Sequence, residues 1–159
     1  VAPLPPAAPA ALVEGLLERF AVAPERLAGL HFFEERRNLR VLDGAHAPPA
    51  GIAYESRGLD VSRLRGARPK PTTAAAMAFG PGATRNVLDL DGRAFATWRA
   101  RRELRLPLPP AVSPGTVLVR HRGLVTGTGF LRVGEDGAGR LESQFPKAWV
   151  REEAFPDDG

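Results

Sequence analysis

The groups in this chain best suited to bind a ligand are two isolated lysines and the polar residues beside them. Of 22 basic residues only Lys70 and Lys147 are lysine, and arginine supplies the rest. Pro146 fixes the backbone just before Lys147, so the lysine is expected to point into solvent from a rigid support. Ser143 and Gln144 nearby offer neutral donors and acceptors that suit ribose hydroxyls and base edges. This pattern predicts a nucleic-acid contact through Ser143, Gln144 and Lys147.

A second candidate site is a basic cluster around Lys70, opposed only by Asp60. Its members are Arg57, Arg63, Arg65, Arg68 and Lys70. Pro69 and Pro71 hold the backbone extended on both sides of Lys70, and a helix is expected to begin just afterwards. The cluster predicts a phosphate cradle that includes Arg65, Arg68 and Lys70. A solvated charged loop is the alternative interpretation.

A third candidate lies where two predicted strands meet. The runs 116–121 and 124–133 are rich in β-prone residues and join at Arg122-Gly123, which predicts a hairpin. Arg120 precedes this turn and is predicted to contact RNA, whereas His121 is more typical of a surface residue. Gly127 and Gly129 are two residues apart on one face of the second strand, so a backbone or a sugar-phosphate chain could approach that face.

Further elements are expected to position these groups. Apolar spacing predicts a helix from Pro9 to about residue 21, a helical turn over 24–28 and strands over 30–33 and 39–42. A helix over 74–79, capped by Thr72 or Thr73, is followed by a strand over 86–90. Asp91 is expected to cap a third helix that carries Phe95, Trp98 and Leu104. The prolines and glycines of 46–51 indicate a loop between two subdomains.

These elements predict an α+β fold. We expect a flexible lead or linker remnant over residues 1–9 and a small α/β adaptor subdomain over 10–50. A mixed, strongly bent β-barrel with short helices is expected over 51–152, and a flexible tail over 153–159. Glycines inside a strand are typical of such a bent barrel, because they mark bulges and corners.

The composition argues against several kinds of site. The chain has no cysteine, and its 3 histidines lack the spacing that places two ligands on one helical face, so we expect no metal and no cofactor. No nucleophile lies beside a predictable base, which argues against an enzyme. No apolar run approaches the ~20 residues that span a bilayer, and residues 1–9 lack the features of a signal peptide, so we expect a cytoplasmic monomer.

The motifs together resemble one family. The stretches 58–77, 83–90 and 115–129, and above all Gly139-Arg-Leu-Glu-Ser-Gln-Phe-Pro-Lys-Ala-Trp149, are similar to the C-terminal region of Sun-type RNA (cytosine-5) methyltransferases. That region is a PUA-like domain preceded by a small adaptor. The resemblance covers about residues 30–151. The chain contains neither the cysteines nor the cofactor-binding sheet of the family's methyltransferase domain.

The resemblance implies a non-catalytic module that binds structured rRNA or tRNA in RNA modification or ribosome biogenesis. The module would be a separate protein or would accompany a methyltransferase domain. Two other hypotheses stay open: an adaptor that docks on a protein partner through the N-terminal helix and the 30–43 strands, and a small enzyme acting on nucleotides.

Overall fold

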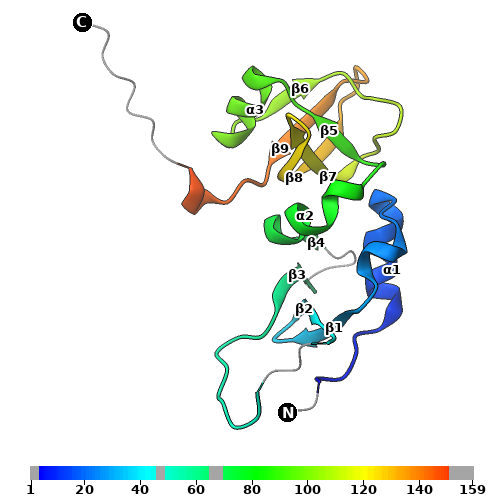
Figure 1. Ribbon diagram of the computed structural model, residues 1–159. Coiled ribbons are helices and arrows are strands. Elements are labelled where there is room, and N and C mark those ends of the chain that lie inside the picture. The colour runs from blue at the N-terminus through cyan, green and yellow to red at the C-terminus, as the bar shows by residue number, and fades with distance from the viewer. Residues whose placement is uncertain (1–3, 46–48, 65–69, 151–159) are drawn as a thin grey trace, which may run out of the picture.

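The computed structural model describes residues 4–45, 49–64 and 70–150, which form an α+β fold with two sheets (Figure 1). The helices are α1 (Ala10–Phe20), η1 (Pro24–Leu27), α2 (Thr73–Phe79), η2 (Gly80–Gly82), α3 (Gly92–Arg99) and η3 (Lys147–Trp149), where η marks a 3₁₀ turn. The strands are β1 (Leu30–Glu35), β2 (Asn38–Asp43), β3 (Leu59–Arg63), β4 (Lys70–Pro71), β5 (Val87–Asp89), β6 (Leu104–Leu106), β7 (Gly115–His121), β8 (Leu124–Val133) and β9 (Gly139–Ser143). No helix in these ranges is long and apolar enough to cross a membrane.

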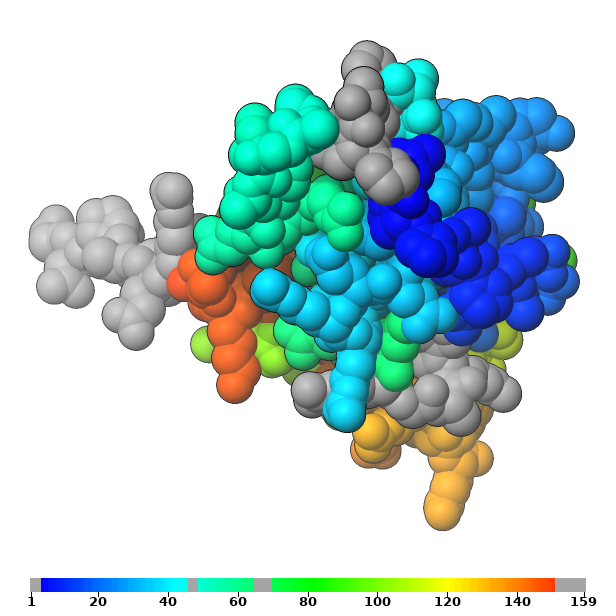
Figure 2. Space-filling model, turned by 90° about the horizontal axis from the view of Figure 1, so that it is seen from below, coloured from blue at the N-terminus to red at the C-terminus, as the bar shows by residue number. Residues whose placement is uncertain are grey.

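The first sheet is antiparallel, with strand order β1-β2-β3-β4. Its strands β1 and β2 belong to the expected adaptor subdomain of residues 10–50, whereas β3 and β4 belong to the expected barrel of residues 51–152. The segment 4–9 also contacts it: the amide of Ala8 donates to the carbonyl of Phe32 over 2.8 Å, and His31 Nε2 lies 2.7 Å from the carbonyl of Pro5. Figure 2 shows this blue N-terminal segment beside the cyan strands.

The second sheet contains five mixed strands in the order β5-β7-β8-β9-β6 and curls into half a barrel. Only β5 and β7 are parallel. The hairpin predicted between 121 and 124 is confirmed, with His121 opposite Leu124. Arg122 and Gly123 both have positive φ, 49° and 80°, which is the conformation of a type I′ turn.

The helix caps explain where two of the helices begin. The Thr72 side chain accepts from the amide of Ala75 over 3.1 Å, and Asp91 accepts from the amide of Ala94 over 2.8 Å. Both caps agree with the sequence prediction. The third helix is shorter than predicted, however, because Arg101 has a φ of 61° and the chain then turns into β6, which includes Leu104.

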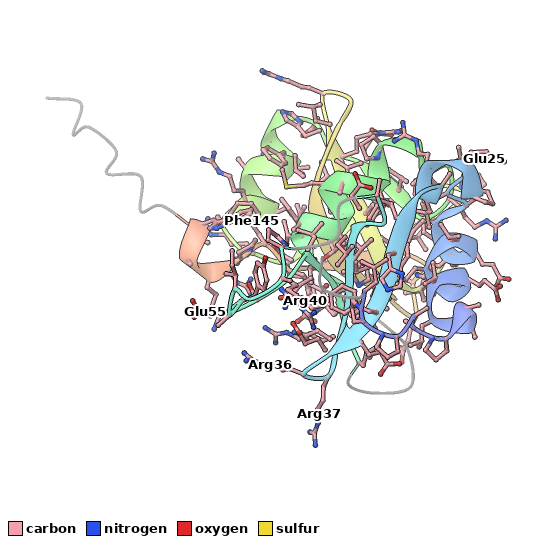
Figure 3. All side chains as sticks on the ribbon, turned by 60° about the horizontal axis from the view of Figure 1, so that its bottom comes forward. Glu25, Arg36, Arg37, Arg40, Glu55 and Phe145 are labelled. Atoms are coloured by element: carbon pink, nitrogen blue, oxygen red, sulfur yellow. The ribbon has the colours of Figure 1, made fainter. Side chains whose placement is uncertain are left out.

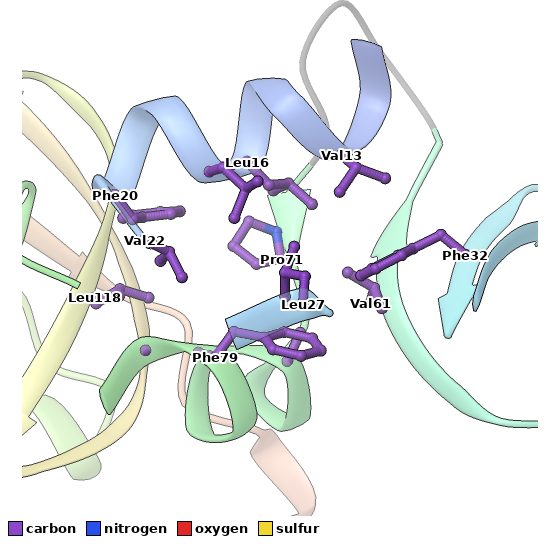
Figure 4. A pocket seen from close by; sticks show the side chains of 14 residues that line it. Val13, Leu16, Phe20, Val22, Leu27, Phe32, Val61, Pro71, Phe79 and Leu118 are labelled. Atoms are coloured by element: carbon purple, nitrogen blue, oxygen red, sulfur yellow. The ribbon is translucent and has the colours of Figure 1, made fainter. Parts of the chain in front are cut away.

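The apolar core has three parts that follow the two sheets and their junction. One part centres on Leu39 and Val61 under the first sheet, and another on Trp98 and Leu131 inside the curled sheet. The third lies between the sheets, where α2 packs against both β3 and β8. An apolar cavity of about 50 Å³ remains at this junction, bordered by Phe20, Pro71 and other side chains of α1, α2 and both sheets (Figure 4).

Candidate nucleic-acid interface

Lys70 stands on β4, the edge strand of the first sheet, opposite Arg63 of β3. Two side-chain hydrogen bonds between β3 and the β4 segment fix the backbone around Lys70. Buried Ser62 donates from Oγ to the carbonyl of Lys70 over 2.8 Å, and Thr72 donates from Oγ1 to the carbonyl of Asp60 over 2.6 Å. The short strand therefore presents the lysine side chain from a fixed position, although Lys70 itself is exposed.

A pocket of about 280 Å³ lies beside Lys70, and residues from both sheets line it. Its walls are formed by Arg63, Lys70, Pro71, Thr72, Thr73, Thr128 and Gln144. Thr128 belongs to β8 and Gln144 follows β9, so groups from the two sheets meet here. The walls carry two cations, one amide and three threonine hydroxyls, of which those of Thr72 and Thr128 already donate within the protein. This set can bind phosphate through charge and ribose or base edges through hydrogen bonds.

Gln144 is fixed in the pocket by the neighbouring strand. Thr128 donates from Oγ1 to Gln144 Oε1 over 3.1 Å, and the backbone amide of Gln144 donates to the carbonyl of Thr128 over 3.2 Å. These bonds leave the side-chain NH₂ as the donor that Gln144 can offer a ligand.

The electrostatics of the pocket are set by a few charges around Lys70. Burial within the pocket walls lowers the pKa of the Lys70 ammonium from its ordinary 10.5, Glu142 opposes that shift, and Arg63 and Arg101 add to it. A group crowded by cations and partly shielded from water gains most from a bound anion. Lys70 is thus placed to bind a phosphate.

The other predicted residues are distributed unevenly around this pocket. Arg65 and Arg68 lie outside the described residues. Lys147 is exposed at the start of η3, three positions after Gln144. Ser143 is 5% exposed and its Oγ accepts from the amide of Phe145 over 3.2 Å, so this hydroxyl supports the turn out of β9 instead of facing solvent.

Arg120 is occupied by an acidic neighbour. Its Nε and Nη2 each lie 2.6 Å from one carboxylate oxygen of Asp89, a bidentate pair that forms because β5 and β7 run parallel. Hydrogen bonding to Arg120 lowers the pKa of Asp89 and raises that of Arg120. The two nitrogens that would grip a phosphate are therefore already engaged.

The glycines of β8 serve packing within the protein. A Cβ at Gly127 would lie 3.0 Å from Trp98 Cη2, and one at Gly129 would lie 2.5 Å from Leu141 Cδ1. The expectation that this face admits a ligand is wrong, because the core of the curled sheet fills it. His121 also has a structural role: Nδ1 donates to the carbonyl of Leu90 over 2.7 Å, and its ring stacks on Phe95 at 4.4 Å.

Several contributors to this surface were not predicted as ligand contacts. Thr72 and Thr73 were predicted only as helix caps, and Thr128, between the two glycines, carries no distinguishing signal in the sequence. Arg101, just after α3, donates from Nη1 to the carbonyl of Phe145, next to Gln144. Within the described residues, no three acidic or histidine side chains are grouped as a metal site.

No family model matches the chain, and no curated protein matches it either.

Proposed function

We propose that this chain is a non-catalytic module that binds structured RNA, rRNA or tRNA, through the pocket between its two sheets. In this proposal the curled sheet is a PUA-like domain, and the protein acts in the cytoplasm as a monomer in RNA modification or ribosome biogenesis. It does so either alone or together with a methyltransferase domain. The sequence resemblance supports the family, and the pocket supports the kind of ligand.

The observation that carries the proposal is the meeting of Lys70, Arg63 and Gln144 in one pocket. The three residues come from two different sheets and from positions up to 81 apart in sequence, yet line the same space of about 280 Å³. Cations that hold a phosphate, next to the Gln144 amide and the Thr73 hydroxyl that can bind the adjoining sugar, match the repeating chemistry of an RNA strand. Because most of these contacts address the backbone, we expect the module to prefer RNA shape over sequence.

RNA binding is favoured over the protein-adaptor hypothesis by the contacts of the elements that the adaptor would use. The adaptor would dock through the N-terminal helix and the 30–43 strands, but Leu12, Val13 and Leu16 of α1 pack against the core under the first sheet. The strands of 30–43 are likewise joined to β3 and to the 4–9 segment. These surfaces are used within the chain.

The test is direct binding of labelled tRNA and of a structured rRNA fragment in a filter assay. We expect binding by the wild type, and a loss of about fivefold or more for Lys70→Ala, because each close phosphate contact contributes roughly 1 kcal/mol or more. Arg93→Ala is the matched control, since Arg93 is exposed on α3 and does not border the pocket. No measurable affinity of the wild type for either RNA, or equal losses in the two variants, would refute the proposal.

A further inference from the structure

Trp149 and Phe145 belong to the same segment after β9, but only Phe145 is buried. Phe145 is 9% exposed, whereas Trp149 keeps 53% of its surface open to solvent. Tryptophan is enriched at binding surfaces because its ring combines a large apolar face with a polar N–H group, so an exposed Trp149 is a candidate contact.

The exposed ring of Trp149 is connected to the core by two successive aromatic contacts. Its centroid lies 6.0 Å from that of Phe145 in an edge arrangement, and Phe145 in turn contacts buried Trp98 at 5.2 Å. The 3₁₀ turn η3 closes with the amide of Trp149 donating to the carbonyl of Pro146 over 2.9 Å. Figure 3 labels Phe145 beside this turn, and in Figure 2 the orange-red end of the described chain projects from the surface. The ring is therefore fixed in place while part of it stays open.

Basic residues link the segment that carries Trp149 to the pocket. Arg101 donates to the carbonyl of Phe145, and the same guanidinium lies close enough to Lys70 to lower the pKa of its ammonium. Phe145 directly follows Gln144, which lines the pocket, and exposed Lys147 stands two positions before Trp149. An aromatic ring flanked by cations is how proteins hold unpaired bases along a strand.

We infer that Trp149 is a stacking platform for an unpaired base of the RNA whose backbone occupies the Lys70 pocket. This inference rests on the proposed function and adds the class of RNA to it: a folded RNA with an unpaired base next to the bound backbone. A wholly paired helix offers no free base face, so it would use the pocket without the platform.

The two tryptophans allow a spectroscopic test of the platform. Trp98 is fully buried and Trp149 is 53% exposed, so acrylamide added to the wild type quenches mainly the emission of Trp149. We expect a stem–loop RNA with an unpaired loop to quench that accessible emission. The same RNA should also protect the ring from acrylamide. A blunt duplex of equal length should change the emission little.

Affinity measurements complete the test. Stacking contributes enough that Trp149→Ala should weaken binding of the stem–loop by about 5- to 150-fold, with an unchanged salt slope, whereas Trp149→Phe should retain most of the affinity. The blunt duplex should bind wild type and Trp149→Ala alike.

Two results would overturn the inference: equal affinity of the wild type and Trp149→Ala for the stem–loop, or an emission of Trp149 that the stem–loop leaves unaltered. In both cases RNA binding by the wild type would stand, because it is measured separately. If neither RNA bound the wild type, the proposed function and the platform would fail together.

Discussion

Replacing Arg40 with methionine should destabilise the protein and alter how its stability depends on pH. Arg40 is only 8% exposed, on β2 in the middle of the first sheet. Its Nη1 lies 2.6 Å from Glu35 Oε2, its Nε lies 3.0 Å from Asp60 Oδ1, and its Nη2 donates to the carbonyl of Gly58 over 3.4 Å. Figure 3 labels Arg40 among the side chains of this sheet. Methionine replaces the aliphatic part of the arginine side chain and removes its charge and donors.

The expected loss follows from the burial of the partners. Removing one member of a fully buried ion pair costs about 3–5 kcal/mol, because the remaining charge loses its partner. Here the side chains of Glu35 and Asp60 keep 23% and 48% exposure, and Arg57 remains 3.2 Å from Glu35. Water and Arg57 therefore compensate in part, and we expect a loss of about 1.5–2.5 kcal/mol at pH 7. For a chain of this size that is a fall in Tm of about 4–8 °C.

The pH dependence follows from Glu35. Hydrogen bonding to Arg40, and then to Arg57, lowers the pKa of Glu35 below its ordinary 4.5 despite some opposing burial. The Glu35–Arg40 ion pair therefore stabilises the fold fully above about pH 4.5, the ordinary pKa of Glu35. This contribution disappears as the pH falls through the lowered pKa that Glu35 has in the folded protein. The gap in unfolding free energy between the wild type and Arg40→Met should be widest at pH 7 and narrower at pH 3.

Urea denaturation at both pH values measures the gap. Arg132→Met is the control, because its pair with Glu142 is 3.6 Å long and exposed on both sides, so we expect a change below about 0.5 kcal/mol. Equal stability of Arg40→Met and the wild type at pH 7, or a gap of the same size at pH 3, would refute this account of the network.

Three further changes test the core, the junction and the charge of the site. Gly129→Ala should lower the unfolding free energy by about 2 kcal/mol in urea, because its Cβ would lie 2.5 Å from Leu141 Cδ1 in a filled core; an unchanged midpoint would contradict the packing. Asn86→Ala should cost about 2–3 kcal/mol by calorimetry, because this buried side chain joins α1 to the loop before β7 through hydrogen bonds of 2.7 and 2.8 Å; an unaltered Tm would argue against that link. Glu142→Gln should tighten RNA binding about two- to fivefold, because it removes the acid near Lys70, and weaker binding would count against the proposed electrostatics.

Local signals in the sequence were sufficient for several elements. The hairpin at Arg122-Gly123 was predictable because glycine accommodates the positive φ that a two-residue turn requires. The caps at Thr72 and Asp91 were predictable because such side chains satisfy free helix amides. In each case the cause lies within a few residues of the effect. The α+β class followed from the same patterns.

Elements that depend on distant partners were not predictable. β6 is a strand because it pairs with β9, Leu104 opposite Leu141, and no pattern near Leu104 distinguishes it from the end of a helix. The strand β3 likewise forms beside β2, whereas the sequence placed only a charged stretch there. Short strands such as these owe their conformation to the sheet they join.

In the candidate site, too, local features were predictable and contacts between distant residues were not. The residue types of Lys70 and Gln144 suggested binding groups, but their meeting depends on α2, which connects the two sheets. The engagement of Arg120 could not be foreseen either, because Asp89 reaches it through the parallel pairing of β5 with β7 across 31 positions. Thr128 became a pocket residue only through the register of β8.

The most direct test of the central claim is the salt dependence of RNA affinity for the wild type and Lys70→Ala. If Lys70 holds a phosphate in the pocket between the sheets, the slope of log affinity against log salt should become shallower by about 0.7–0.9 in the variant. Arg93→Ala should leave the slope as it is in the wild type. A slope for Lys70→Ala that equals the wild-type slope would place the RNA elsewhere and contradict the account.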